Sequence, residues 1–181
     1  MPSTRFGPAF ALVLALVLAG CVGGAGFLGL EHPTATVENR ASVGYDVTIT
    51  TVHTDDPLPE LPVALRYRNG TLERTTLGAE GIEDDPDPVF FVPENVTAFR
   101  ADGPPVDRWN VSLGPSERVT TTLGDWRPGD VVFVEWERPD GTVVRVKRVG
   151  CRRGLQSFER YVEDRRGGGG GGTSCTEGGP I

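Results

Sequence analysis

The sequence predicts an all-β fold, and more narrowly a single antiparallel β-sandwich. Glycine accounts for 25 and proline for 15 of the 181 residues, which indicates many short elements joined by turns rather than long helices. Runs of alternating apolar and polar residues recur at close spacing, and no helical period occurs before residue 155. Two antiparallel sheets packed face to face would bury such runs. A small closed barrel is the alternative.

The first strands are expected in residues 34–39 and 44–53. In the second run, Tyr45, Val47 and Ile49 alternate with polar residues, which is the period of a half-buried strand. Val52 breaks this alternation, so we expect a bulge or the end of the strand there. The later candidates are residues 63–67, 71–77, the two short runs 89–92 and 95–100 split by Pro93, and residues 109–113, 118–123, 131–136 and 143–149. These runs correspond to about eight or nine strands in all.

Two hairpins are expected between these strands. Asn69-Gly70 separates two β-prone runs, and this dipeptide favours a tight turn in which both residues take positive φ. Pro139-Asp140-Gly141 separates the two clearest strand candidates. Both hairpins agree with antiparallel sheets.

The turn before residue 131 contains Pro128-Gly129-Asp130. It is similar to the Pro-Gly-Asp corners that precede a strand in many extracellular immunoglobulin-like modules. This resemblance implies an Ig-like sandwich over residues 34–150. Trp126 lies in the same turn, and we expect it to cap the core, although an exposed tryptophan would suit a carbohydrate- or partner-binding module.

Residues 151–181 are expected to form an extension after the β domain. Leu155, Phe158 and Val162 have the spacing of an amphipathic stripe, which predicts a short helix over residues 155–165. The six glycines of residues 167–172 indicate a flexible tail.

The start of the chain carries a signal for the cellular location of the protein. An apolar run of about ten residues follows Arg5, as in a signal peptide over residues 1–20. The run ends in Leu18-Ala19-Gly20-Cys21, which resembles the lipobox of prokaryotic lipoproteins. In that family the chain is cut before the cysteine, and the cysteine carries the lipid.

The resemblance implies a mature chain that begins at a lipidated Cys21 and is held on the extracellular face of the cell membrane. Residues 21–33, which are rich in glycine, would form a flexible tether. An uncleaved N-terminal anchor and a plain secretory signal are the alternatives.

Of the three cysteines, Cys21 lies near the start of the chain, and Cys151 and Cys175 lie near its C-terminal end. If Cys21 carries lipid, Cys151 and Cys175 are the remaining thiols, and two such cysteines most often pair in an oxidising compartment. The bridge would be worth roughly 3 kcal/mol in the chain-entropy model. Free thiols and an intermolecular bond are the alternatives.

The charge composition is unusual. The net charge is −7, and a single lysine, Lys147, stands against 17 arginines. This usage resembles that of extreme halophiles, which implies a haloarchaeal cell-surface protein; the alternative is an ordinary acidic protein from an arginine-rich genome. Such an acidic chain argues against nucleic-acid binding. Residues 137–166 nevertheless carry a basic surplus, which marks either an interaction surface or a protected sheet edge.

Three asparagines, Asn69, Asn95 and Asn110, are each followed two residues later by serine or threonine. This is the acceptor pattern for N-glycosylation on a secreted chain, and we expect at least one of them to be modified. Asn69 also has an alternative role in its turn.

No catalytic, metal or cofactor motif stands out. The sequence contains no Gly-x-Ser-x-Gly elbow, His-Glu-x-x-His motif or phosphate-binding loop. His32 and His53 would need Cys151 to complete a copper site, and the usual local spacing is missing. We interpret the acidic cluster as a solvated loop rather than a calcium site; its members are Glu83, Asp84, Asp85 and Asp87.

These observations predict a non-enzymatic surface lipoprotein with one β-sandwich domain that acts as a structural or binding module. Its partners would be membrane lipid through Cys21 and a cell-surface protein or glycan, with no cofactor. One alternative is a small surface enzyme or accessory subunit that uses residues 84–87 as an acidic site. Another is a pilin-like filament subunit, although the Gly-rich tether is poorly suited to the long helix of a filament core.

Overall fold

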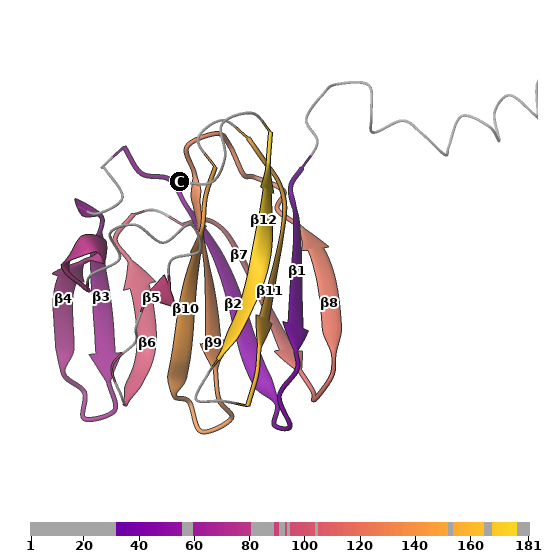
Figure 1. Ribbon diagram of the computed structural model, residues 1–181. Helices are drawn as coiled ribbons and strands as arrows, with labels where there is room; N and C mark the ends of the chain where they lie inside the picture. The colour runs from indigo at the N-terminus through magenta and orange to yellow at the C-terminus, as the bar shows by residue number, and fades with distance from the viewer. Residues whose placement is uncertain are drawn as a thin grey trace, which may run out of the picture. The chain divides into compact units, whose positions relative to one another are not determined.

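The structure is a computed structural model that describes residues 32–55, 60–80, 89–90, 93, 95–103, 105–151, 154–164 and 168–176 (Figure 1). The predicted signal peptide and most of the predicted tether lie outside these residues. No helix formed by the described part is long and apolar enough to cross a membrane. The elements are β1 (Thr34–Asn39), β2 (Tyr45–Val52), β3 (Pro62–Tyr67), β4 (Leu72–Thr76), the 3₁₀ turn η3 (Leu77–Glu80), β5 (Val89–Phe90), β6 (Val96–Ala101), β7 (Pro105–Leu113), β8 (Arg118–Thr122), β9 (Val131–Glu137), β10 (Val143–Val149), β11 (Leu155–Val162) and β12 (Gly169–Cys175).

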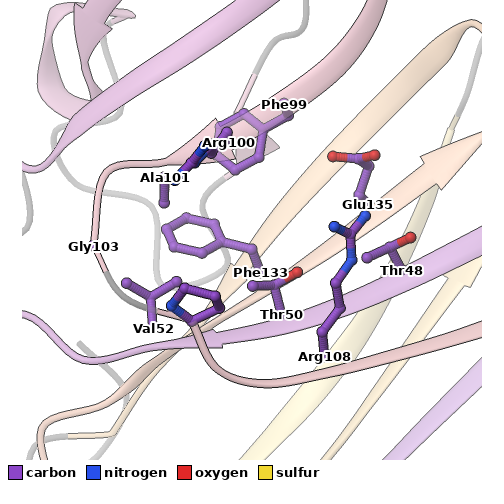
Figure 2. Close-up of a pocket in the computed structure, with 11 residues that line it drawn as sticks. Thr48, Thr50, Val52, Phe99, Arg100, Ala101, Gly103, Arg108, Phe133 and Glu135 are labelled. Carbon is purple, nitrogen blue, oxygen red and sulfur yellow. The ribbon is translucent and has the colours of Figure 1, made fainter.

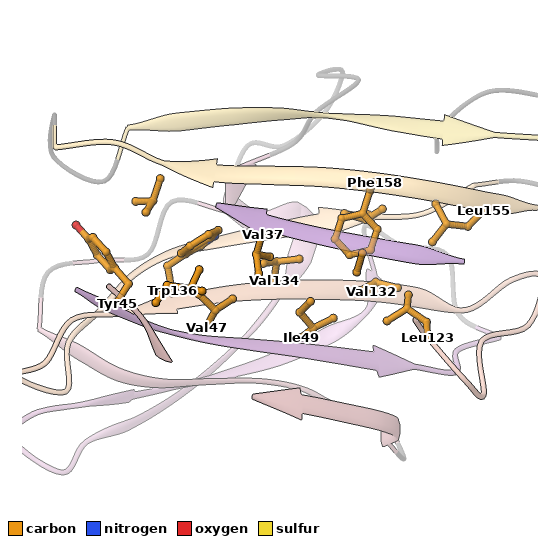
Figure 3. Close-up of a cluster of buried hydrophobic side chains, with 14 of the residues drawn as sticks. Val37, Tyr45, Val47, Ile49, Leu123, Val132, Val134, Trp136, Leu155 and Phe158 are labelled. Carbon is orange, nitrogen blue, oxygen red and sulfur yellow. The ribbon is translucent and has the colours of Figure 1, made fainter. Parts of the chain in front are cut away.

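Two sheets packed face to face form the main body of the domain. Sheet A has the strand order β12-β11-β1-β8, and sheet B has the order β5-β10-β9-β2-β7. Val47, Val134 and Trp136 of sheet B meet Val37 and Phe158 of sheet A in a buried core (Figure 3). The alternating residues of each strand supply this core because successive side chains of a strand point to opposite faces.

A third sheet, sheet C, has the order β4-β3-β6 and contributes to a second core on the other face of sheet B. Val131 and Phe133 of β9 belong to this second core, whereas Val132 and Val134 belong to the first. Leu65 of β3 is among the residues that sheet C adds. The prediction of a single sandwich is therefore wrong, because sheet B is covered on both faces.

One strand pair departs from the predicted antiparallel arrangement. β1 runs parallel to β11, with Ala35 opposite Phe158, and antiparallel to β8 on its other side. The parallel pair is possible because these strands are far apart in the chain and need no tight turn. Each sheet keeps two edge strands, so the described residues do not form the closed barrel that was the alternative.

Both predicted hairpins form, but with a longer turn than Asn69-Gly70 suggests. Only Gly70 has a positive φ, 86°, and Asn69 does not. The backbone N–H of Gly70 donates to Tyr67 O at 2.9 Å, and that of Tyr67 donates to Thr71 O at 2.9 Å. The turn between β9 and β10 repeats this pattern around Gly141, whose φ is 79°. Each hairpin therefore needs one left-handed glycine rather than two residues at positive φ.

The predicted helix over residues 155–165 is wrong, because Leu155–Val162 is strand β11. Phe158, Arg160 and Val162 alternate as buried residues along it. Arg160 is only 2% exposed, so a charged residue occupies an interior position. When only apolar residues are counted, Arg160 interrupts the two-residue period of the strand, and the pattern no longer predicts a strand.

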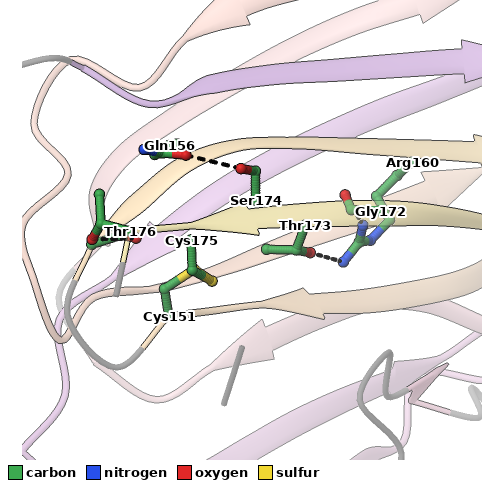
Figure 4. Close-up of a disulfide and its surroundings, with 9 residues drawn as sticks. Cys151, Gln156, Arg160, Gly172, Thr173, Ser174, Cys175 and Thr176 are labelled. Carbon is green, nitrogen blue, oxygen red and sulfur yellow. Dashed lines mark hydrogen bonds between the residues drawn. A yellow bond between two sulfur atoms is a disulfide. The ribbon is translucent and has the colours of Figure 1, made fainter. Parts of the chain in front are cut away.

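The predicted flexible tail is also corrected, because Gly169–Cys175 forms strand β12 at the edge of sheet A. The Arg160 guanidinium donates to Gly172 O at 2.8 Å and to the Thr173 hydroxyl at 2.8 Å (Figure 4). The Tyr161 side chain packs so closely on Gly170 that a Cβ there would lie 2.7 Å from its hydroxyl oxygen. Neighbouring side chains thus cover the glycines, and residues 155–175 complete the β domain instead of extending from it.

Part of the basic surplus of residues 137–166 is buried. Lys147 is 3% exposed and Arg145 is 7% exposed, both on β10. Arg145 donates to Gly169 O of β12 at 3.1 Å. These cations therefore contribute to the interior and its edge, and not to an open interaction surface.

Candidate functional site

A crevice lies between sheet B and strand β6 of sheet C. We call it the B–C crevice; its volume is about 200 Å³. The Phe99 and Phe133 rings pack together in it with centroids 5.3 Å apart. Figure 2 shows side chains from β2, β6, β7 and β9 converging on it. Its lining residues are Thr48, Thr50, Val52, Phe99, Arg100, Ala101, Gly103, Pro105, Arg108, Phe133 and Glu135.

The strand register explains why these side chains meet. Thr50 of β2 is paired with Phe133 of β9 on one side and with Arg108 of β7 on the other. Thr48 of β2 is paired with Glu135 of β9. Paired residues share one face of a sheet, so these five side chains share the face of sheet B that sheet C partly covers.

Glu135 is the electrostatically unusual member of the crevice. Burial, followed by the nearby charge of Glu137, raises its pKa to about 7, while Arg108 and a hydrogen bond from the Phe99 backbone N–H act in the opposite direction. Burial also raises the pKa of Glu137, with Asp46 adding to the rise. Near neutral pH the Glu135 carboxyl can therefore both donate and accept hydrogen bonds.

Arg108 supplies the opposite chemistry beside Glu135. Its side chain is exposed, and its guanidinium lies near Glu135 in Figure 2. The salt bridges found among the described residues do not include this pair. The crevice therefore offers a guanidinium, a carboxyl of tunable charge, two threonine hydroxyls and an aromatic wall, which suits binding of a small polar group.

The predicted cysteine pair forms a disulfide. Cys151 and Cys175 are bonded with Cα atoms 5.8 Å apart (Figure 4). Cys151 is fully buried and Cys175 packs against the main core. The bond joins the chain just after β10, in sheet B, to the end of β12, in sheet A. It thus fastens the glycine strand to the sandwich. Cys21 lies outside the described residues.

All three predicted glycosylation sites are exposed. The Asn69 side-chain oxygen accepts a bond from the Thr71 N–H at 2.9 Å, so it has the turn role as well. Asn95 has a positive φ of 69°, and its carbonyl accepts from the Arg68 N–H at 2.8 Å. Asn110 accepts a bond from the Thr48 hydroxyl at 2.8 Å. In each of these hydrogen bonds an oxygen of the asparagine is the acceptor. The side-chain nitrogen, which would carry a glycan, takes no part in these bonds.

The Pro-Gly-Asp turn has a structural role. Asp130 is fully buried, accepts the Arg127 N–H at 2.8 Å and lies 2.7 Å from Nδ1 of His53. Trp126 is half-buried and packs against the main core, as expected for a capping residue. The turn therefore closes one end of the sandwich.

The described residues contain no group of three or more histidine, cysteine and carboxylate side chains that could hold a metal. His53 is engaged with Asp130, and Cys151 is in the disulfide. The acidic cluster at Glu83, Asp84, Asp85 and Asp87 lies outside the described residues.

Sequence reasoning did not identify the B–C crevice. Its residues come from four separate strands, so no local motif joins them. One signal was present, because Glu135 interrupts the otherwise apolar run of residues 131–136. A carboxylate in a run that is buried on both faces is a candidate for a perturbed pKa.

Comparison with known proteins agrees with the all-β fold. A family model described as halobacterial Ig domain protein matches residues 1–179. Neither the curated proteins nor the solved structures contain a significant match. The family match spans nearly the whole length of the sequence and supports the halophilic interpretation of its charge. The chain belongs to the family of halobacterial Ig domain proteins.

Proposed function

We propose that the protein is a non-enzymatic binding module that is anchored by lipid on the extracellular face of the cell membrane. The lipobox-like Leu18-Ala19-Gly20-Cys21 supports the anchor, and the Gly-rich residues 21–33 support a tether. The family match supports a structural or binding role for the domain. Its partner would be a cell-surface protein or a glycan.

The observation that carries a location outside the cytoplasm is the Cys151–Cys175 disulfide. Disulfides persist in oxidising compartments and are rare in reducing ones. Both cysteines lie in the domain, so Cys21 remains the one cysteine available for lipid.

The strand pairing indicates at which end of the sandwich the tether would join the domain. Thr34 is paired with Ser157, and Cys175 with Leu155, so the start of β1 and the disulfide share one end of the sandwich. The β3–β4 and β9–β10 hairpins lie at the other end (Figure 1), where Arg68 donates to the Thr142 hydroxyl at 2.6 Å. A tether that precedes β1 would therefore join the domain at the disulfide end.

The glycosylation candidates lie toward the hairpin end of the domain. Asn69 is in the β3–β4 turn, and the Arg68 N–H donates to the Asn95 carbonyl, so these two sites are neighbours at the hairpin end. Asn110 lies on β7 three residues before the end of that strand, which is paired with the start of β2. Glycans there would leave the disulfide end, where the tether would join, uncovered.

The B–C crevice is the proposed ligand site. Burying the Glu135 carboxyl lowers stability, and an apolar residue in its place would avoid that loss. Such a group is more readily explained by binding than by folding. Its neighbours Arg108, Thr48 and Thr50 would orient a polar ligand against Phe99.

The anchor is tested in a halobacterial host with the wild-type chain, Cys21→Ser, and Val22→Ser as a control that keeps the cysteine. We expect the wild type and Val22→Ser in the membrane fraction, with a lipidated chain that starts at Cys21 and gains two hydrogens on reduction. Cys21→Ser should lose the lipid and the membrane association. A full-length mass and unchanged membrane association for Cys21→Ser would instead favour an uncleaved anchor.

A further inference from the structure

The outer face of sheet C carries three arginines, one on each strand. Arg74 of β4 and Arg100 of β6 are both paired with Ala64 of β3, and Arg66 of β3 is paired with Leu72 and Ala98. These six residues share one face, which we call the arginine face. The opposite face of sheet C is the one that packs in the second core through residues such as Val63 and Leu65.

The three arginines lie close together for like charges. Neighbouring strands are about 4.8 Å apart, so Arg74 and Arg100 start roughly 10 Å from each other across Ala64. Arg66 is diagonal to both, at about 7–8 Å. All three side chains are exposed. One anionic segment can therefore contact more than one of these guanidinium groups at once.

The outer face of sheet A provides an internal comparison. There Arg40 contacts Glu38 at 2.8 Å, and Arg118 contacts Glu159 at 3.3 Å. Arg66, Arg74 and Arg100 have no such carboxylate partner among the ion pairs of the described residues. In a chain with a net charge of −7, exposed arginines with no carboxylate partner in the described part of the chain are candidates for binding an external anion.

The shape of the arginine face fits a ligand that lies across the strands. A shallow hollow of about 500 Å³ is lined by these arginines together with Ala64, Ala98 and Leu72. Pro62, Val63 and Asp102 also line it, and Asp102 is the one carboxylate among the described lining residues. The small alanines form a low floor between longer guanidinium side chains.

We propose that the arginine face is a docking surface for an acidic segment of a partner protein. Guanidinium groups bind carboxylates with two parallel hydrogen bonds, so three of them on one face suit an acidic segment. Leu72 is 50% exposed and is, with Val43, one of two large apolar side chains that stand out on the described surface. Arginine around an exposed apolar residue is typical of protein interfaces, and favours a protein over a glycan.

High salt strengthens the case for direct contact. In molar salt the screening length falls to about 3 Å, so attraction at long range disappears and short bidentate bonds remain. A halobacterial partner would therefore have to place its carboxylates directly on the guanidinium groups. This surface is distinct from the B–C crevice, although Arg100 also lines the crevice.

The test uses the full chain in detergent and molar salt, with a labelled peptide of aspartate, glutamate and leucine as the probe. A peptide of the same length with asparagine and glutamine replacing the acids is the matched probe. Arg66→Ala with Arg74→Ala removes two guanidinium groups that do not line the crevice. Arg127→Ala is the control for a lost exposed arginine, and Glu135→Gln reports whether the peptide binds in the crevice instead.

We expect the acidic peptide to bind the wild type, and the uncharged peptide to bind at least about tenfold more weakly. The double arginine variant should lose at least about tenfold in affinity for the acidic peptide, while the Arg127→Ala control stays within about twofold. Thermal unfolding of the double variant should match that of the wild type, because both side chains are exposed.

Three results would overturn the proposal. One is failure of the acidic peptide to bind the wild type, and another is equal binding to the double arginine variant. The third is tighter binding of polygalacturonate than of the peptide, which would indicate a surface for an anionic glycan. A loss of binding in Glu135→Gln with no effect of the double variant would move the peptide site to the crevice.

Discussion

The buried Glu135 carboxyl should make the domain less stable as the pH rises from about 5 to 8. Its pKa rises from 4.5 to about 7 in the folded protein, with burial as the main cause. Between those values the unfolded chain releases the proton and the folded domain keeps it. The folded state then binds more protons, so the free energy of unfolding falls with increasing pH until it levels off above 7.

The size of this effect follows from the pKa difference. Each pKa unit corresponds to about 1.4 kcal/mol, so a rise from 4.5 to about 7 is worth roughly 3 kcal/mol at pH 8. Glu135→Gln keeps the shape and a hydrogen-bond acceptor for the Phe99 N–H but cannot ionise. At pH 8 this variant should be more stable than the wild type by roughly 2–3 kcal/mol, and at pH 4.5 the two should be nearly equal.

Urea denaturation followed by tryptophan fluorescence measures the difference, since Trp136 is fully buried. Molar salt in the buffer screens the exposed carboxylates. Glu137 also has a raised pKa and should contribute a slope of the same sign in both proteins, so the difference between them reports Glu135 together with its coupling to Glu137. Asp125→Asn, in an exposed loop, is the matched control and should leave the pH slope of the wild type unchanged.

A parallel pH dependence in the wild type and in Glu135→Gln would refute the reasoning. It would mean that the B–C crevice hydrates the carboxyl as well as bulk water does. The argument for the crevice as a ligand site would then lose its main electrostatic support.

Three further perturbations test the packing. Replacing Cys151 and Cys175 with serine should lower the free energy of unfolding by roughly 3 kcal/mol, and a loss below about 1 kcal/mol in urea denaturation would count against the bond as a structural one. Gly171→Ala should cost roughly 1–3 kcal/mol, because a Cβ there would overlap the Glu159 carbonyl and the residue has a φ of 155°. Gly172→Ala should change the free energy of unfolding by no more than about 0.5 kcal/mol, because a Cβ there would meet open space. Equal effects of Gly171→Ala and Gly172→Ala on thermal unfolding would show that β12 does not pack as described. Asn39→Ala should cost about 3 kcal/mol in thermal unfolding. The buried Asn39 amide donates to three backbone carbonyls, including Leu113 O and Gly114 O, and these would lose their partner. A nearly unchanged melting temperature would mean that water replaces this amide.

Local patterns predicted the strands well where the alternation was undisturbed. The run from Tyr45 to Ile49 forms β2, and the break in alternation at Val52 coincides with a shift of register between Thr51 and Val52. The Asn69-Gly70 hairpin also forms. These features depend on residues within a few positions of each other, which a sequence shows directly.

Sheet membership depends on distant partners and was not predicted. Residues 131–134 are four apolar residues in a row, and the structure buries both faces of β9. A continuous apolar run is the sequence signal of a strand that is covered on both sides. That signal implied a third layer, but it did not identify residues 62–101 as the segment that supplies it.

The C-terminal strands show why the remaining elements could not be read locally. Glycine has a low preference for strands, and the Leu155, Phe158 and Val162 spacing fits a helix when Arg160 is counted as polar surface. In the structure these two exceptions lie against each other, because the Arg160 guanidinium donates to Gly172 O and to the Thr173 hydroxyl. The strand period of β11 becomes visible only when Arg160 is counted as an interior residue, and its partner strand is glycine-rich β12. Neither strand is evident from its own residues, and the crevice around Glu135 likewise depends on the distant strand β6.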